Sequence, residues 1–220
     1  MRTLLHAAAL GVAAGLLAFF PDRDDGSGSL LAGLGVFAGA LLGLRALRRV
    51  RPLPQRSVNE HARLVLAALG VGVAVGLANL GVNFAMASLD AGTREQMVTR
   101  WAEFSTWSVV FSGPIIEEIA YRLVLLSGLA WLIAWRTRNP RTVEWGALAI
   151  ASAVFGVAHI FYGGVESTAY VVGMALKSTA GGLAFGLVFW RWGLPYSMLA
   201  HCAANGVHLL LMPLLFSRAG

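Results

Sequence analysis

Two adjacent glutamates and an arginine lie inside a long apolar stretch of the chain. Glu117, Glu118 and Arg122 are the charged residues between positions 104 and 135. A charged side chain within a membrane costs at least about 2.5 kcal/mol, so three together need a reason. In a helix, residues four apart share a face, so Glu118 and Arg122 can pair, whereas Glu117 is turned about 100° away and lies outside that pairing. The spacing predicts a structural ion pair beside a carboxylate that can do chemistry.

Three further polar residues lie in two other apolar segments. His159 ends the sequence Phe155-Gly156-Val157-Ala158-His159, and His201 and Asn205 lie four residues apart in a later segment. A single histidine in an apolar helix is more often a packing residue than a catalyst. Polar groups in lipid, however, face the interior of a helix bundle. We therefore expect His159, His201 and Asn205 to lie in one site with Glu117.

Two kinds of chemistry are open to these residues. A carboxylate and a neutral imidazole can bind and deprotonate a water, while a second imidazole and an amide donate hydrogen bonds to the oxyanion of an attacked carbonyl. Alternatively, Glu117, His159 and His201 could hold a catalytic zinc ion with an open position for water. Both routes lead to hydrolysis of an amide, and the residues alone do not choose between them.

Composition places the chain in a membrane. Apolar residues make up 57% of its 220 residues and charged residues 13%, and the apolar residues form long unbroken blocks. A membrane-spanning helix needs roughly 20 such residues. The expected fold class is therefore all-α, a polytopic transmembrane helix bundle of about seven spans, with six to eight as the range. The expected spans are residues 4–20, 30–47, 64–89, 104–135, 145–161, 167–190 and 196–216.

The basic residues predict the orientation. With the N-terminus in the cytoplasm, eleven basic residues lie on the cytoplasmic side and four outside, and seven spans place the C-terminus outside. Because the arginines lie in short loops between apolar blocks, we expect no nucleic-acid partner despite the net charge of +6. We expect one integral membrane domain over residues 1–220 with a motif-bearing core at about 104–216, and an uncleaved first span rather than a signal peptide.

Glycine and proline positions predict how the helices meet. Gly35, Gly39 and Gly43 recur every four residues, as do Gly72 and Gly76, and such spacing lets a neighbouring helix approach closely. Pro114 removes a backbone donor, so the fourth span should break or kink just before the two glutamates. That irregularity is also needed because His201 lies near the start of its span and His159 near the end of another.

The motifs together resemble a known family. Glu117-Glu118-x-x-x-Arg122, then Phe155-x-x-x-His159, then His201-x-x-x-Asn205 is similar to the CPBP (Abi) family of intramembrane proteases. That family includes the type II CAAX prenyl endopeptidases and is usually described as metalloproteases, although a metal-free glutamate mechanism has also been argued. The resemblance covers residues 113–205, and the first three spans carry no motif of the family.

The resemblance implies roles for the residues. Glu117 would activate water with His159, His201 and Asn205 would complete the site, and Glu118 and Arg122 match the family's paired positions. It implies an intramembrane protease of a bacterial plasma membrane, whose partners are membrane lipids and a membrane-associated protein or peptide substrate of CAAX type. Zn²⁺ is the implied cofactor if a metal is used. A catalytically idle scaffold or immunity protein of the same family, and a proton-coupled transporter built on the buried Glu, His, Lys and Arg residues, are the alternative functions.

Overall fold

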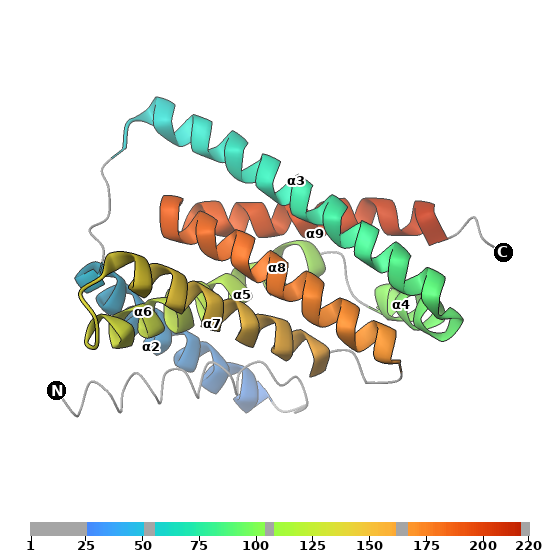
Figure 1. Ribbon diagram of the computed structural model, residues 1–220, viewed down its shortest axis with the longest axis horizontal. Helices are drawn as coiled ribbons and strands as arrows, with labels where there is room; N and C mark the ends of the chain where they lie inside the picture. The colour runs from blue at the N-terminus through green and yellow to red at the C-terminus, as the bar shows by residue number, and fades with distance from the viewer. Residues whose placement is uncertain (1–25, 51–55, 104–107, 162–166, 217–220) are drawn as a thin grey trace. The chain divides into compact units, whose positions relative to one another are not determined.

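The computed structural model describes residues 26–50, 56–103, 108–161 and 167–216. Every regular element in these ranges is helical, and they contain no strand (Figure 1). This agrees with the all-α fold class. Three of the helices, Val58–Leu89 (α3), Pro140–Phe161 (α7) and Thr168–Trp192 (α8), are long and apolar enough to cross a membrane. The count of seven spans stays a prediction from the sequence.

The helices coincide with most of the expected spans. Gly26–Val50 (α2), α3, α7, α8 and Leu194–Phe216 (α9) cover the second, third, fifth, sixth and seventh. The fourth consists of shorter pieces, Ser108–Ser112 (η1), Gly113–Glu117 (α5), Glu118–Leu126 (η2) and Ser127–Ala134 (α6). The expected first span at 4–20 lies outside the described residues, as do positions 104–107 of the fourth.

Two helix starts differ from expectation because of capping residues. The helix α3 begins six residues early, since Ser57 and Glu60 form a reciprocal capping box at its N-terminus. Residues 90–103, expected as a loop, form the helix Ala91–Glu103 (α4). Asp90 accepts hydrogen bonds from the backbone N–H and the hydroxyl of Thr93, which caps this helix. Hydrogen bonds from Thr93 and from Ser167 also lower the pKa of Asp90.

The chain divides into two compact units. Unit 1 comprises the described residues within 1–55 and 116–151, and unit 2 those within 56–115 and 152–220. In unit 1, α2 packs against η2 and α6. A Cβ atom added at Gly43 would lie 2.0 Å from the carbonyl oxygen of Leu123, so the two backbones are in direct contact. The close approach predicted from the glycine repeat of this span is therefore present at Gly43.

In unit 2, α3 and α9 lie side by side and run in the same direction (Figure 1). A Cβ at Gly72 would lie 2.2 Å from the carbonyl oxygen of Ala200, and one at Gly76 would lie 2.7 Å from that of Ala204. Ala200 and Ala204 lie on either side of His201 in α9. The glycine pair of a helix that carries no family motif therefore determines where the motif helix α9 lies.

The helix α8 runs antiparallel to both α3 and α9. Along α3 and α8, Met86 packs against Gly173 and Val75 against Gly181, so the residue numbers run in opposite directions. At one end of unit 2, the Arg56 guanidinium donates hydrogen bonds to the carbonyls of Arg191 and Trp192. The predicted topology requires Arg56 and Arg191 to share one side of the membrane, and they lie at the same end of this unit.

The glycine contact gives a first prediction. We expect Gly72→Ala to destabilise the protein by about 1–3 kcal/mol, because the added methyl group meets backbone atoms of α9 that cannot move aside independently. Thermal unfolding in detergent measures the change. Gly70→Ala is the matched control on the same helix, since a Cβ there meets nothing within 4 Å and alanine favours the helix. Equal unfolding midpoints for the two variants would contradict the packing.

Candidate active site

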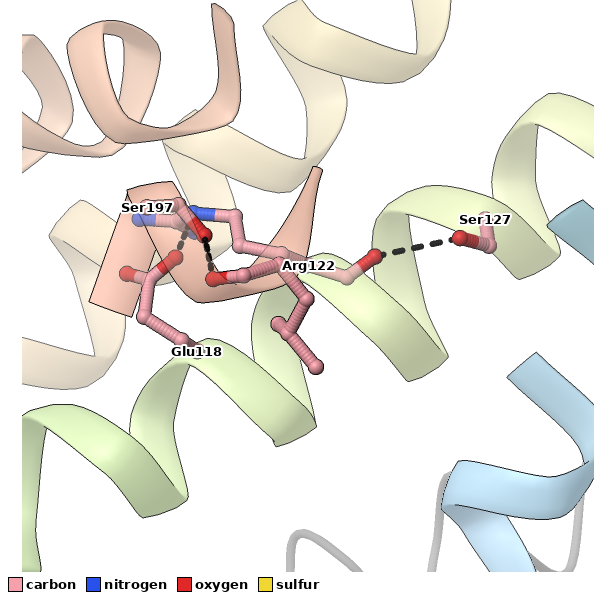
Figure 2. A network of polar contacts seen from close by, with 5 residues as sticks. Glu118, Arg122, Ser127 and Ser197 are labelled. Atoms are coloured by element: carbon pink, nitrogen blue, oxygen red, sulfur yellow. Dashed lines mark hydrogen bonds and ion pairs between the residues drawn. The ribbon is translucent and has the colours of Figure 1, made fainter. Parts of the chain in front are cut away.

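The two glutamates of the acidic motif differ in burial. Glu118 and Arg122 are 0% and 1% exposed, and the Arg122 Nε lies 3.4 Å from a Glu118 carboxylate oxygen (Figure 2). Glu117, the last residue of α5, is only partly buried. The ion pair expected from the four-residue spacing is therefore present. Of the two glutamates, Glu117 is the one whose side chain is partly exposed.

The helix that carries this pair is a π-helix, which the sequence analysis did not predict. In η2 the backbone N–H groups bond to carbonyls five residues earlier rather than four. At its end, both the backbone N–H and the hydroxyl of Ser127 donate to the carbonyl of Arg122, the latter over 3.2 Å (Figure 2). π-Helices are rare and frequently occur at functional sites. The fourth span is thus irregular on both sides of Glu117.

Asn205 stabilises the irregular backbone before Glu117. Its side-chain amide donates a 2.8 Å hydrogen bond to the carbonyl of Val109 in η1. In the π pattern that carbonyl would be bonded by residue 114, but Pro114 has no N–H. Asn205 supplies the donor that proline lacks. Since an amide nitrogen carries two N–H groups, the second stays available for another acceptor.

His159 is fixed in one tautomer by its own helix. Its Nδ1 lies 2.8 Å from the carbonyl oxygen of Phe155, which can only accept a hydrogen bond. Nδ1 therefore carries the proton, and the lone pair of the neutral ring is at Nε2. The ring also packs against the Phe155 ring, with centroids 4.3 Å apart, because helical side chains lean towards the N-terminus.

His201 contacts the same phenylalanine from another helix. The His201 ring is 5% exposed, stacks on Phe185 of α8 at 4.5 Å between centroids, and meets Phe155 edge-on at 6.1 Å. The depth difference expected between His159 and His201 is removed in two ways. Phe155, one turn before His159, is level with His201, and the His159 ring lies back towards it.

Unit 2 therefore brings His159 and His201 together around Phe155, and Asn205 lies one helical turn after His201 on α9. Glu117, Glu118 and Arg122 belong to unit 1. The association of Glu117 with the two histidines is part of the proposal below. Phe185 was not singled out from the sequence, and nothing distinguishes it there from other apolar residues. Asn83 was also missed, although a polar residue in an apolar span is the same signal that identified Asn205.

The predicted zinc ligands lie on three different helices, Glu117 on α5, His159 on α7 and His201 on α9. Within the described residues, no three His, Cys, Asp or Glu side chains gather as ligands. The predicted ligand set of Glu117, His159 and His201 is divided between the two units.

Comparison with known proteins places the motifs in one family. Residues 99–207, about half of the chain, match the family described as type II CAAX prenyl endopeptidase Rce1-like. The matched region contains every motif residue from Glu117 to Asn205. No curated protein and no solved structure matches the chain. Its apolar helices agree with the membrane setting of that protease family. Through this region, the chain belongs to the Rce1-like family of type II CAAX prenyl endopeptidases.

Proposed function

We propose that this protein is an intramembrane endopeptidase that hydrolyses a peptide bond of a membrane-associated protein or peptide, with lipidated CAAX-type chains as the expected substrate class. The observation that carries the proposal is the meeting of His159 and His201 around Phe155, from two different helices. Membership of a protease family supports hydrolysis of a peptide bond as the reaction.

Glu117 and His159 activate the water in this proposal. The Glu117 carboxylate accepts a proton as the water oxygen attacks the carbonyl carbon, and the Nε2 lone pair of His159 holds the water in place. The proton is then delivered to the leaving amine as the C–N bond breaks. The proposal requires Glu117 to reach the two histidines. Glu117 ends α5, and α5 directly follows η1, to which Asn205 is hydrogen-bonded.

His201 and Asn205 stabilise the oxyanion in this proposal. The negative charge that develops on the attacked carbonyl oxygen takes hydrogen bonds from the His201 ring and from the second N–H of Asn205. Phe185 and Phe155 keep the His201 ring in a low-dielectric environment, where such bonds are strongest. Glu118 and Arg122 form a buried ion pair within the helix that follows Glu117 and stabilise that helix.

A metal-dependent reaction uses the same residues differently. A zinc ion bound by Glu117, His159 and His201 would supply a Lewis acid and lower the pKa of its bound water. Two imidazoles and one carboxylate suit that ion chemically. The choice between the two routes is made by the chelation experiment below.

The exposed apolar surface of α3 supports a membrane setting. Large apolar side chains of α3, among them Leu66, Leu77 and Phe84, are 50–70% exposed. Membrane lipids are their natural partners. We place the protein in the plasma membrane of a bacterium with its N-terminus in the cytoplasm and its C-terminus outside, following the distribution of basic residues.

The purified protein should cleave a fluorogenic lipidated peptide in detergent, and this assay tests the proposed function. We expect turnover by the wild type, measured with prenylated and acylated peptides. The same assay with a zinc chelator separates the two routes. An unchanged rate fits the side-chain reaction, whereas a loss that added Zn²⁺ restores shows a metal centre.

A folded wild-type protein that cleaves none of these peptides would contradict the proposal. A scaffold or immunity function would then take its place if partner binding survives replacement of Glu117. A proton-coupled transporter would take its place if reconstituted vesicles show substrate-dependent proton flux.

A further inference from the structure

The C-terminal end of α2 carries three arginines on one face. Arg48 and Arg49 follow Arg45 by three and four residues, and all three side chains are exposed. On the other side of this helix, Gly43 and Leu47 are buried, and Gly43 meets the backbone of η2. At about 100° per residue, the three arginines point away from Gly43 by about 120° or more. The arginine face is therefore turned outward from the packing of unit 1.

These arginines belong to a membrane helix rather than to a loop. Arg45 lies inside the second expected span, residues 30–47, and α2 continues as a regular helix to Val50. The three side chains therefore leave the last two turns of an apolar helix. A long cationic side chain on the outward face of such a helix extends to the headgroup layer, where its charge is hydrated. Phosphate groups are the anions of that layer.

The three guanidinium groups are available for an external anion. Within the part of the chain that the structure describes, the side chains of Arg45, Arg48 and Arg49 form no ion pair and no hydrogen bond. A guanidinium group presents five N–H donors in a planar fork, and this geometry matches a phosphate group in a bidentate manner. The face thus has the donors and the charge that a phosphate needs.

A second group of arginines lies at the same end of unit 1. The turn between α6 and α7 lies at this end beside the C-terminus of α2, and α2 packs against α6 (Figure 1). Trp135 and Trp145, on either side of the turn, are 44% and 49% exposed, as is typical at a membrane interface. Residues 45–49 and 136–145 carry six arginines and one glutamate, a net charge of +5. The arginines of the turn, all exposed, are Arg136, Arg138 and Arg141.

The preference of basic residues for the cytoplasm does not account for this placement. That preference determines the side of the membrane on which arginines lie, and arginines in a connecting loop satisfy it. Here three of them lie within the helix, on its outward face. A cluster of four to eight basic residues directly beside an apolar span is typical of a site for anionic lipids.

We propose that the outward face of α2 at Arg45, Arg48 and Arg49 binds the phosphate of an anionic phospholipid headgroup. The arginines of the α6–α7 turn strengthen the positive potential at this end. The ligand class is a glycerophospholipid with a net negative charge, because the cation of a zwitterionic headgroup would be repelled. The site shares no residue with the candidate active site, so it does not depend on the proposed peptidase function.

The test is the affinity of the full-length protein for phosphatidylglycerol and phosphatidylcholine with the same acyl chains, measured by native mass spectrometry from detergent. We expect phosphatidylglycerol to bind at least about tenfold more tightly. A variant that combines Arg45→Gln, Arg48→Gln and Arg49→Gln should reduce this preference to within about threefold. The corresponding triple lysine variant should keep most of it, since the charge is retained. Equal affinities of the wild type for the two lipids, or an unchanged preference in the glutamine variant, would overturn the site.

A comparison of single charges separates a local site from the net charge of the protein. Arg48→Gln should weaken the binding of phosphatidylglycerol about fivefold. Arg63→Gln removes an exposed arginine of α3, in unit 2, and should change this affinity by less than about twofold. Because both side chains are exposed, neither variant should unfold, so a loss of binding reports recognition. Equal losses in the two variants would assign the attraction to net charge and overturn the site.

A competition experiment separates a lipid from a soluble anion. Excess inorganic phosphate, compared with sodium chloride at the same ionic strength, should leave phosphatidylglycerol bound, because the acyl chains also contribute to its affinity. Complete displacement by inorganic phosphate would assign the arginines to a soluble anion and overturn the lipid site.

Discussion

Glu117→Gln is expected to lower the rate of peptide cleavage by about 10²–10⁴-fold while leaving the fold intact. The amide has nearly the shape of the carboxylate but cannot accept the proton of the attacking water. Because Glu117 is only partly buried and lies outside the Glu118–Arg122 pair, its neutralisation should leave the thermal unfolding midpoint close to that of the wild type. Cleavage of the fluorogenic peptide and thermal unfolding in detergent measure the two properties.

Glu95→Gln is the matched control for this loss of charge. Glu95 is an exposed carboxylate on α4, so its replacement should change neither the cleavage rate nor the unfolding midpoint. A Glu117→Gln protein with the wild-type rate would remove Glu117 from the mechanism.

Single replacements in the Glu118–Arg122 pair should have the opposite effect. We expect Glu118→Leu or Arg122→Met to destabilise the protein by about 3–5 kcal/mol, because each leaves the other charge buried without this partner. The double variant should recover at least about 2 kcal/mol of that loss, since it removes both charges and keeps apolar side chains of similar length. Unfolding of the two single variants and the double variant gives the coupling energy.

A coupling energy within about 0.5 kcal/mol of zero would show that the pair does not act as a unit. Taken together, the two experiments assign different roles to two adjacent glutamates. Loss of Glu117 removes activity from a folded protein, and loss of Glu118 destabilises the fold.

Some of this arrangement could be predicted from residue spacing alone. The Glu118–Arg122 ion pair follows from a four-residue interval, and the contacts of Gly43 and Gly72 follow from repeats of small residues. The ion pair can be predicted because both partners lie on one helix. The glycine contacts can be predicted because a residue without a side chain lets the backbone of a neighbouring helix approach closely.

Other features depend on contacts between helices and were not predictable. In the π-helix η2, backbone N–H groups bond to carbonyls five residues earlier instead of four. The sequence of the segment does not indicate which of the two patterns forms. Lys177 of α8 donates a hydrogen bond to the side-chain oxygen of Asn83 on α3. That contact depends on how α3 and α8 are rotated about their axes, which hydrophobic patterns in two fully apolar helices do not specify.

The capping residues show a signal that was present but not used. Asp90 and Thr93 mark the start of α4, and Ser57 and Glu60 mark the start of α3. Both pairs have the spacing of N-terminal caps. Residues 90–103 lie between two expected spans, and this local cap was the better indicator of their structure.

Mass spectrometry of the products formed in H₂¹⁸O tests the central claim most directly. The purified wild-type protein would be incubated with a lipidated peptide in detergent, and both fragments would be weighed. Hydrolysis by an activated water predicts two fragments, with one ¹⁸O atom in the new carboxyl group, and predicts that Glu117→Gln yields neither in the same time. Fragments formed equally by the Glu117→Gln protein, or none from a folded wild type, would contradict the account.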